Sequence, residues 1–336
     1  MAAPGTVYTD ADWATREYFA PKVQDVVFNS NATTAVLRKT MRTVSGGTHI
    51  DSFYNYKKST QGGWFTRSDT YTQAFEQKFD AARWQWKLLQ EPVALFMQDI
   101  LENEGSEQRR FDLVMHENMA AAKAMADNFG SALFSLNDYT NTDKIDSLDL
   151  AIAAGTTVYA GVTRATSGDG LLWAANVDSS STTLNLSVLN DLYLDCSEGT
   201  DQPNLIVSNN KAFGLYYDEL TPIQRQQSDE LLGQAGFTSL LFNGKPWIID
   251  SHVNSTDRSV PASGDVANNG TPVASEYVYM MNTNYMEIVA HRSAAFTWSN
   301  VMQPIDQWAV VGRYYFMGNV PVYNPRFFGK LTAITA

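Results

Sequence analysis

Residues 106–135 have the sequence SEQRRFDLVMHENMAAAKAMADNFGSALFS, which has the pattern of one long helix. Ser106 is a favoured N-cap residue and Glu107 follows in the first turn, so together they predict the start of a helix. The apolar residues beyond them recur every three or four positions, as one stripe of a helix does: Phe111, Met115, Met119, Ala122, Ala126, Phe129 and Leu133. About 25 residues at ~1.5 Å each make a rod ~37 Å long. The alanines of residues 120–126 predict that this rod lies close against a sheet.

The segment before this helix carries two further patterns. Glu91–Pro92 predicts the start of a shorter helix that ends at Gly105, so residues 81–145 are predicted to be helical. Residues 36–80 are predicted to form one long β-hairpin, with strands at 48–56 (THIDSFYNY) and 64–71 (WFTRSDTY) around a turn-type stretch, KKSTQGG. A lone two-stranded hairpin is marginally stable in water. It therefore needs another surface, either the body of this chain or a neighbouring copy.

Residues 1–35 have no sustained period and carry scattered apolar residues: Trp13, Tyr18, Phe19, Val23, Val26, Val27 and Phe28. An isolated arm of this kind cannot bury those side chains by itself, so we expect it to lie along something else.

The second half of the chain is predicted to be mixed, with helices and strands. Thr221 and Pro222 predict the N-cap and first residue of a helix. The dipeptide Asn243–Gly244 between two apolar runs predicts a tight hairpin. Residues 254–275 have the composition of a surface loop, and residues 276–336 alternate as strands.

Composition excludes several classes of protein. The 336 residues carry a net charge of −12, which argues against a tight nucleic-acid binder. Only 18% of residues are charged, so much of the surface is neutral and polar, and such a surface is easily buried against copies of itself. Cys196 is the single cysteine, which excludes a disulfide framework and a cysteine-based zinc site. Neither a signal peptide nor a run of 18 apolar residues is found, so we expect no membrane span.

Motifs that carry chemistry are also missing. The four histidines, at 49, 116, 252 and 291, form no metal-binding pair, and there is no nucleophile elbow. Gly244–Lys245 is followed by Pro246 and a strand, not by the helix that a phosphate loop requires. The acidic run of residues 138–149 lacks the spacing of a calcium loop and is interpreted as a solvated connector. We therefore predict no enzyme activity, no cofactor, and no catalytic, cofactor-binding or metal-binding residue.

The order of segments resembles the major capsid protein family of tailed bacteriophages. PVALFMQDILENEG, running on into the helix quoted above, resembles the family's spine-helix passage. VYAGVTRATSGDGLLWAANV resembles the start of its axial domain, with Gly161, Arg164 and Trp173 matching a Gly…Arg…Trp pattern. QPNLIVSNNKAFGLYYDEL, GFTSLLFNGKPWIIDSHV and NTNYMEIVAHR resemble its later passages.

The resemblance implies an α+β fold of the Hong Kong phage type. Its parts are an N-terminal arm (1–35), an extended β-hairpin loop (36–80), a peripheral domain with the spine helix (81–145 and 291–336) and an axial domain (146–290). The implied function is self-assembly into pentamers and hexamers of an icosahedral shell around packaged double-stranded DNA, without sequence-specific binding. The implied partners are a scaffolding protein, which we expect to be a separate chain, a portal and a decoration protein. The implied location is the virion, with assembly in the bacterial cytoplasm.

Other functions stay open at this point. A tail, sheath or surface-layer protein would form tubes or flat arrays, and an encapsulin-like compartment would enclose cargo. An enzyme with an unrecognised site would be a monomer with a deep pocket.

The intersubunit contacts are expected on the arm and the extended loop, through Trp13, Phe28, Phe53, Lys57, Lys58, Trp64 and Arg67. Residues 36–80 hold seven basic and four acidic groups, a net of +3, whereas residues 146–290 hold five basic and seventeen acidic groups, a net of −12. A basic loop and an acidic body are complementary when copies lie side by side.

Overall fold

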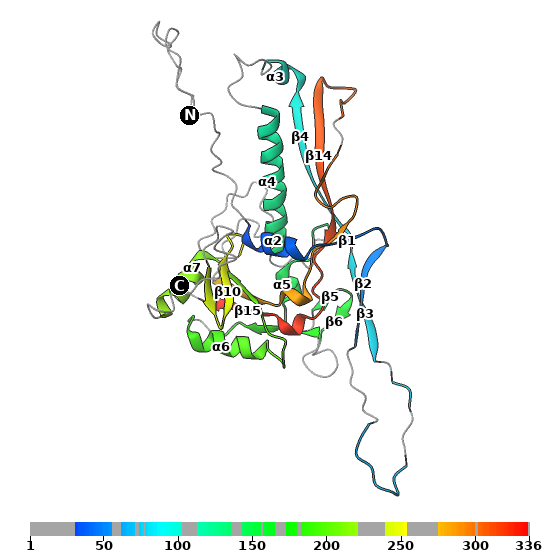
Figure 1. The fold of residues 1–336 in the computed structure, drawn as a ribbon, viewed down its shortest axis with the longest axis vertical. Helices are drawn as coiled ribbons and strands as arrows, with labels where there is room; N and C mark the ends of the chain where they lie inside the picture. Colours follow the sequence, from blue (N-terminus) through cyan, green and yellow to red (C-terminus); the bar gives the residue numbers. More distant parts are fainter. Residues whose placement is uncertain are drawn as a thin grey trace.

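A long helix lies along a two-stranded ribbon in the computed structural model of the chain (Figure 1). The helix is α4 (Leu113–Leu133), and the ribbon is made by β4 (Lys87–Phe96) and β14 (Ala309–Asn319). The strands are antiparallel, with Leu89 opposite Phe316. Phe129 of α4 lies edge-on against Phe316, with ring centroids 5.3 Å apart. The predicted packing of the long helix on a sheet is therefore confirmed.

The structure describes residues 31–55, 62–70, 74–76, 78–102, 113–135, 143–155, 157–164, 173–180, 183–220, 239–253, 275–299 and 302–334. The predicted helix after Thr221 and the loop at 254–275 lie outside these residues, except for Ser275.

The ribbon belongs to a five-stranded sheet. Its strand order is β1–β12–β14–β13, and β4 also pairs with β14. The short strands are β1 (Arg42–Val44), β12 (Val289–His291) and β13 (Thr297–Trp298).

A separate six-stranded sheet has the order β7–β15–β11–β8–β10–β9. Its strands are β7 (Asn176–Asp178), β8 (Leu205–Ser208), β9 (Ser239–Phe242), β10 (Lys245–Ile249), β11 (Glu276–Met281) and β15 (Gly329–Ile334). The predicted turn between β9 and β10 is confirmed, since Asn243 and Gly244 both have positive φ, at 49° and 73°.

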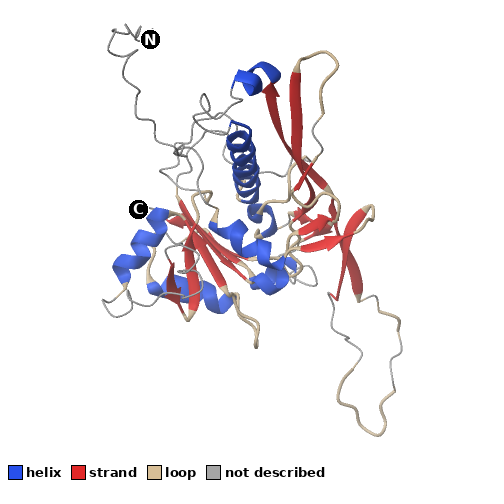
Figure 2. Ribbon diagram, turned by 45° about the horizontal axis from the view of Figure 1, so that its top comes forward, coloured by secondary structure: helices blue, strands red, loops and turns tan. Residues whose placement is uncertain are grey.

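The two faces of this sheet belong to different cores. One face carries Ile206, Trp247 and Met280 and packs against helices α6 (Leu186–Asp195) and α7 (Asn210–Glu219). Figure 2 shows helices in blue beside the red strands of this sheet. The other face joins the core below α4, where Phe134 and Tyr279 have ring centroids 5.6 Å apart. The short helix α5 (Leu148–Ala151) contributes to that core.

The extended hairpin has a different return strand from the one predicted. β2 (His49–Asn55) pairs with β3 (Phe79–Gln85), whereas residues 62–70 contain no strand. The sequence 64–71 is aromatic and β-branched, but those side chains are exposed in the described part of that stretch. The return strand thus lies later in the chain than predicted, and residues 81–85 are strand, not helix.

Two predictions about the helical region are wrong. The segment from Glu91 to Phe96 is strand β4, and the short helix α3 (Met97–Glu102) begins only after it. In α4, Ala122 and Ala126 of the predicted stripe are exposed, while Ala121 and Met125 are buried. Alanine-rich sequence gives little indication of which side faces the sheet, because alanines occur on several sides of the helix.

The last residues of the predicted arm fold onto their own chain. Asn31 caps helix α2 (Ala32–Leu37) by accepting the Thr34 N–H, and Ala32, Thr33 and Leu37 are buried. Residues 1–30 lie outside the described residues.

Three 3-10 turns and a small hairpin complete the described elements: η1 (Arg38–Thr40), η4 (Thr283–Tyr285), η5 (Pro325–Phe327), β5 (Val158–Tyr159) and β6 (Val162–Thr163). Segment 291–336 contributes strands to both sheets, since β14 lies in the five-stranded sheet and β15 in the six-stranded sheet. The domain boundaries stay a prediction.

Candidate functional site

The β2–β3 hairpin has one face on the body and one face in solvent. The register places Ile50 opposite Trp84 and Phe53 opposite Ala81. Ile50 and Trp84 are buried, whereas Phe53 is 81% exposed and Phe79, on the same outer face, is 65% exposed. An outward face with two exposed phenylalanines is typical of a surface that another chain covers.

Exposed aromatic residues continue beyond the two strands. Trp64, Phe65 and Phe75 are all exposed, and Arg67 lies exposed between them. Of the seven predicted contact residues, Phe53, Trp64 and Arg67 therefore lie on the surface of one loop. Trp13, Phe28, Lys57 and Lys58 lie outside the described residues, and their role as intersubunit contacts stays a prediction.

The root of the hairpin is fixed to the body by aromatic packing. Tyr54 stacks on Trp173 with ring centroids 4.5 Å apart, and the Arg83 N–H donates to the carbonyl of Ala160. Buried Arg164 holds Trp173 in place beneath the hairpin. Its Nε donates to the carbonyl oxygen of Trp173 at 3.1 Å, and its guanidinium lies over the Tyr159 ring. The loop therefore leaves the body from a rigid base.

A second exposed apolar surface lies on the ribbon and on the chain leading into it. Leu88 and Phe96 on β4 are both exposed. The segment before β14 adds three exposed side chains: Met302, Ile305 and Trp308. No sequence pattern distinguished these residues, because the same composition also fits a buried strand.

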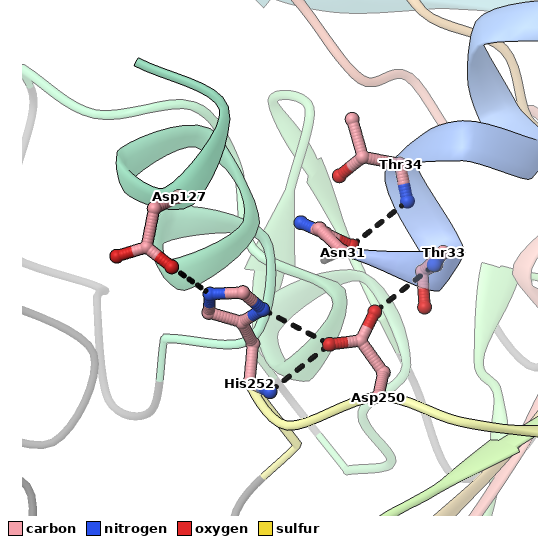
Figure 3. Close-up of polar contacts among 6 residues, drawn as sticks. All are labelled: Asn31, Thr33, Thr34, Asp127, Asp250 and His252. Atoms are coloured by element: carbon pink, nitrogen blue, oxygen red, sulfur yellow. Dashed lines mark hydrogen bonds and ion pairs between the residues drawn. The ribbon is translucent and has the colours of Figure 1, made fainter. Parts of the chain in front are cut away.

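A polar cluster joins three elements that are far apart in sequence (Figure 3). His252 follows β10, and its Nε2 lies 2.7 Å from Oδ1 of Asp127 on α4. Its Nδ1 lies 3.0 Å from Oδ1 of Asp250. The other Asp250 oxygen accepts the backbone N–H of Thr33 in α2 at 3.0 Å. We call Asp127, His252, Asp250 and Thr33 the arm clamp, because they fasten the end of the arm to α4 and to the chain that follows β10 of the six-stranded sheet.

The arm clamp favours a charged histidine. Burial alone would lower the pKa of His252, but hydrogen bonds and charges from Asp127 and Asp250 outweigh it and raise the pKa to about 9. Burial likewise opposes ionisation of Asp250, yet the hydrogen bond and charge of His252 hold the pKa of that carboxyl below its usual value. Both ring nitrogens face carboxylate oxygens, and only the imidazolium can donate to both. The cluster is an ion-pair network, and sequence reasoning missed it because its members are not near one another in the chain.

The geometry of the described residues offers no obvious catalytic or metal centre. The described ranges contain no cluster of three His, Cys, Asp or Glu residues placed to hold a metal. Burial raises the pKa of the Cys196 thiol to about 12, so this cysteine is a poor nucleophile. None of the helices in the described part of the chain is long and apolar enough to cross a membrane.

Comparison with known proteins identifies the architecture. No family model and no curated sequence matches the chain. Solved structures match over nearly its whole length. The capsid of a native GTA particle covers 99% of this chain and 100% of its own at 14% identity, with a TM-score of 0.64. The chain has the tailed-phage major capsid fold. The capsid of cyanophage A-1(L) matches 98% of this chain and 99% of its own at 12% identity, with a TM-score of 0.63.

A shell protein of another kind has the same fold. The SrpI encapsulin from Synechococcus elongatus PCC 7942 matches 99% of this chain and 96% of its own at 9% identity, with a TM-score of 0.57. We use the names of the capsid fold for the corresponding parts of this chain: spine helix for α4, extended loop for the β2–β3 hairpin, and axial domain for the part that contains the six-stranded sheet. The predicted α+β capsid fold is confirmed.

Proposed function

We propose that this chain is the major subunit of an icosahedral shell that encloses double-stranded DNA. The observation that carries the proposal is the extended loop, which projects from the body with Phe53, Trp64 and Phe75 exposed. Burying a large aromatic side chain is worth roughly 1.5–3 kcal/mol, so a loop of this kind gains most of its stabilisation when a neighbour covers it. The capsid fold supplies the geometry in which neighbours repeat by rotation.

The loop and the axial domain also differ in charge. Arg67 is exposed on the loop, and Asp191, Asp195 and Glu219 are exposed on α6 and α7. We propose that Lys57, Lys58 and Arg67 of one subunit lie near such carboxylates of the next. The arm, through Trp13 and Phe28, contacts a neighbour in the same assembly.

The acidic body suits a container wall that does not adhere to its contents, since a net charge of −12 repels DNA phosphates. Hexamers, pentamers, a scaffolding protein, a portal and a decoration protein complete the proposed assembly, which belongs to the virion.

An encapsulin-like compartment is the second candidate, and the match to an encapsulin favours it. Electron microscopy of the purified protein, produced alone, tests both. Round shells of uniform size are expected, while tubes or sheets would contradict both candidates. Nuclease-protected DNA inside particles from the native source supports the virion, and a protein cargo without DNA supports the compartment.

A further inference from the structure

Two stretches of the chain carry no acidic residue, although the whole sequence has 36. They are residues 31–50 and residues 288–305, which are far apart in the sequence. The fold brings them together, because β1 runs parallel to β12 with Val44 opposite His291. Figure 1 shows α2 and β1 at mid-height of the molecule, between α4 and the β2–β3 hairpin.

Three exposed cations gather where these stretches meet. Arg38 and Lys39 lie in η1, and the guanidinium of Arg38 lies over the Phe296 ring, 5.9 Å from its centroid. Phe296 belongs to the turn that Arg292 opens directly after β12, and the backbone N–H of Arg292 donates to the carbonyl of Val44 in β1. We call Arg38, Lys39 and Arg292 the basic patch.

The basic patch has no acidic partner in the described part of its own chain. Arg42, on the adjoining strand β1, forms an ion pair with Glu287 at 2.9 Å, so that pair is neutral. Among the described residues, no carboxylate forms an ion pair with any of the three patch cations. The patch therefore presents three positive charges to solvent on a chain whose net charge is −12.

The surface around the basic patch carries hydroxyl groups and lacks apolar anchors. Four residues with hydroxyl groups are exposed beside the cations: Thr40, Thr43, Ser45 and Ser293. Residues 31–50 and 288–299 expose no large hydrophobic side chain. The centre of a protein–protein interface uses aromatic and apolar anchors, whereas phosphate groups are bound by Arg, Lys, Ser and Thr. The composition of this surface thus fits a phosphate polymer better than a protein.

We propose that the basic patch is a weak contact for the phosphates of double-stranded DNA. This inference rests on the proposed function, in which the shell encloses such DNA. A guanidinium can donate to two phosphate oxygens at once, which suits Arg38 and Arg292 to the DNA backbone. Contacts to phosphates alone carry no base specificity. The rest of the chain is acidic and repels the duplex, so the patch holds DNA weakly and determines which part of the subunit touches it.

Salt-dependent binding of a short duplex tests this contact. Full-length subunits, separated from shells by size-exclusion chromatography, are titrated into a fluorescein-labelled duplex of about 20 base pairs with mixed sequence, at about 25–200 mM NaCl. Fluorescence anisotropy gives the affinity at each salt concentration. The patch variant combines Arg38→Gln, Lys39→Gln and Arg292→Gln.

A matched control variant removes the same amount of charge elsewhere. It combines Arg83→Gln, Lys245→Gln and Arg313→Gln, three positions that are at least partly exposed and lie on β3, β10 and β14. Urea unfolding of both variants checks that the subunit is still folded. Any difference between them in DNA affinity then reports on position and not on net charge.

Wild type and control should bind the duplex with similar affinity, and that affinity should fall as salt rises. Each phosphate contact contributes about −0.9 to the slope of log affinity against log salt, so three contacts give a slope of about −2 to −3. The patch variant should bind about tenfold or more weakly at the lowest salt, and its slope should be close to zero.

Three results would overturn the proposal: equal affinity of wild type and the patch variant, an equal loss in the control variant, or no binding by wild type at the lowest salt. A polyglutamate peptide is titrated in parallel. If it binds as tightly as the duplex and the patch variant loses it too, the patch accepts an acidic protein segment and the proposal is wrong.

Assembly is measured separately, so failure of this proposal can be told from failure of the proposed function. The patch variant should still form round shells, because the only described side-chain contact of its cations is that of Arg38 with Phe296. Shells without a DNA contact would remove only the patch. Tubes or sheets formed by wild type would contradict the shell, while the titration of free subunits would still decide whether the patch binds DNA.

Discussion

A Cβ placed on Gly130 would lie 1.7 Å from Nδ2 of Asn31 and 2.8 Å from its Cγ. The spine helix and the cap of α2 therefore meet where a glycine makes room for the asparagine side chain. Asn31 cannot swing away without loss, because its Oδ1 accepts the Thr34 N–H at 2.9 Å and so caps the helix.

Relative to a glycine-to-alanine change at an open helical position, Gly130→Ala is expected to lower the free energy of unfolding by about 0.5–2 kcal/mol, the usual cost of losing an N-cap. Gly214→Ala is the matched control, since Gly214 lies within α7 with open space where its Cβ would go, and alanine favours a helix by about 1 kcal/mol. Urea unfolding of the subunit measures both. Equal stability of the two variants would contradict the steric role of Gly130.

The arm clamp predicts a pH-dependent stability. The pKa of His252 is raised to about 9 in the folded chain from 6.5, so its contribution is fully present below pH 6.5 and is lost as the pH rises through 9. The difference in unfolding free energy between wild type and His252→Gln should shrink between pH 6 and pH 10, by at most on the order of 3 kcal/mol. His49→Gln, at an exposed position, is the control and should change little. A difference that is constant over this range would show that His252 is not charged in the folded chain.

Phe53→Ser should reduce shell assembly while leaving subunit stability nearly unchanged, because Phe53 is 81% exposed within its own chain. The loss of a buried intersubunit aromatic costs roughly 1.5–3 kcal/mol per contact, repeated over every subunit. Asn55→Ser, on the same face of the hairpin, is the polar control. Light scattering follows assembly, and urea unfolding checks the subunit. Normal assembly of Phe53→Ser would remove this side chain from the proposed interface.

Reversing the charge at Lys57 and Lys58 together, to glutamate, should lower assembly yield at low salt. Each exposed ion pair is worth about 0.2–1 kcal/mol, and salt screens it over about 10 Å at 0.1 M. The defect should therefore fall as salt rises. Substitution of both residues by arginine preserves the charge and should assemble normally. If the glutamate variant and wild type give the same yield at low salt, apolar contacts alone hold the loop.

Sequence patterns predicted the fold well where residues close together in the chain determine the backbone conformation. The turn at Asn243–Gly244 was predictable because both positions need positive φ, which asparagine and glycine tolerate. The long helix was predictable because its apolar spacing is sustained over many residues.

The other features of the fold depend on contacts between residues that are far apart in the sequence. Residues 92–96 form a strand because β14, distant in sequence, pairs with them, and no local pattern separates such a strand from a short helix. In the arm clamp, His252 contacts Asp127, which is 125 positions away in the sequence, and no sequence motif predicts that contact. Exposed Phe53 and Trp64 were predicted as contact residues from composition alone, while exposed Ile305 and Trp308 were missed because strand-like sequence does not reveal which face is covered.

The ribbon against which the spine helix packs can form only late in the synthesis of the chain. β4 ends at Phe96, but its partner begins only at Ala309, and β15 (Gly329–Ile334) inserts between β7 and β11 of the six-stranded sheet. At about 5–20 residues per second, roughly 10–40 s of synthesis separate the two strands of the ribbon. A nascent or truncated chain has neither sheet closed during that time. In the proposed shell, only a chain that has closed both sheets would present a rigid wall to its neighbours.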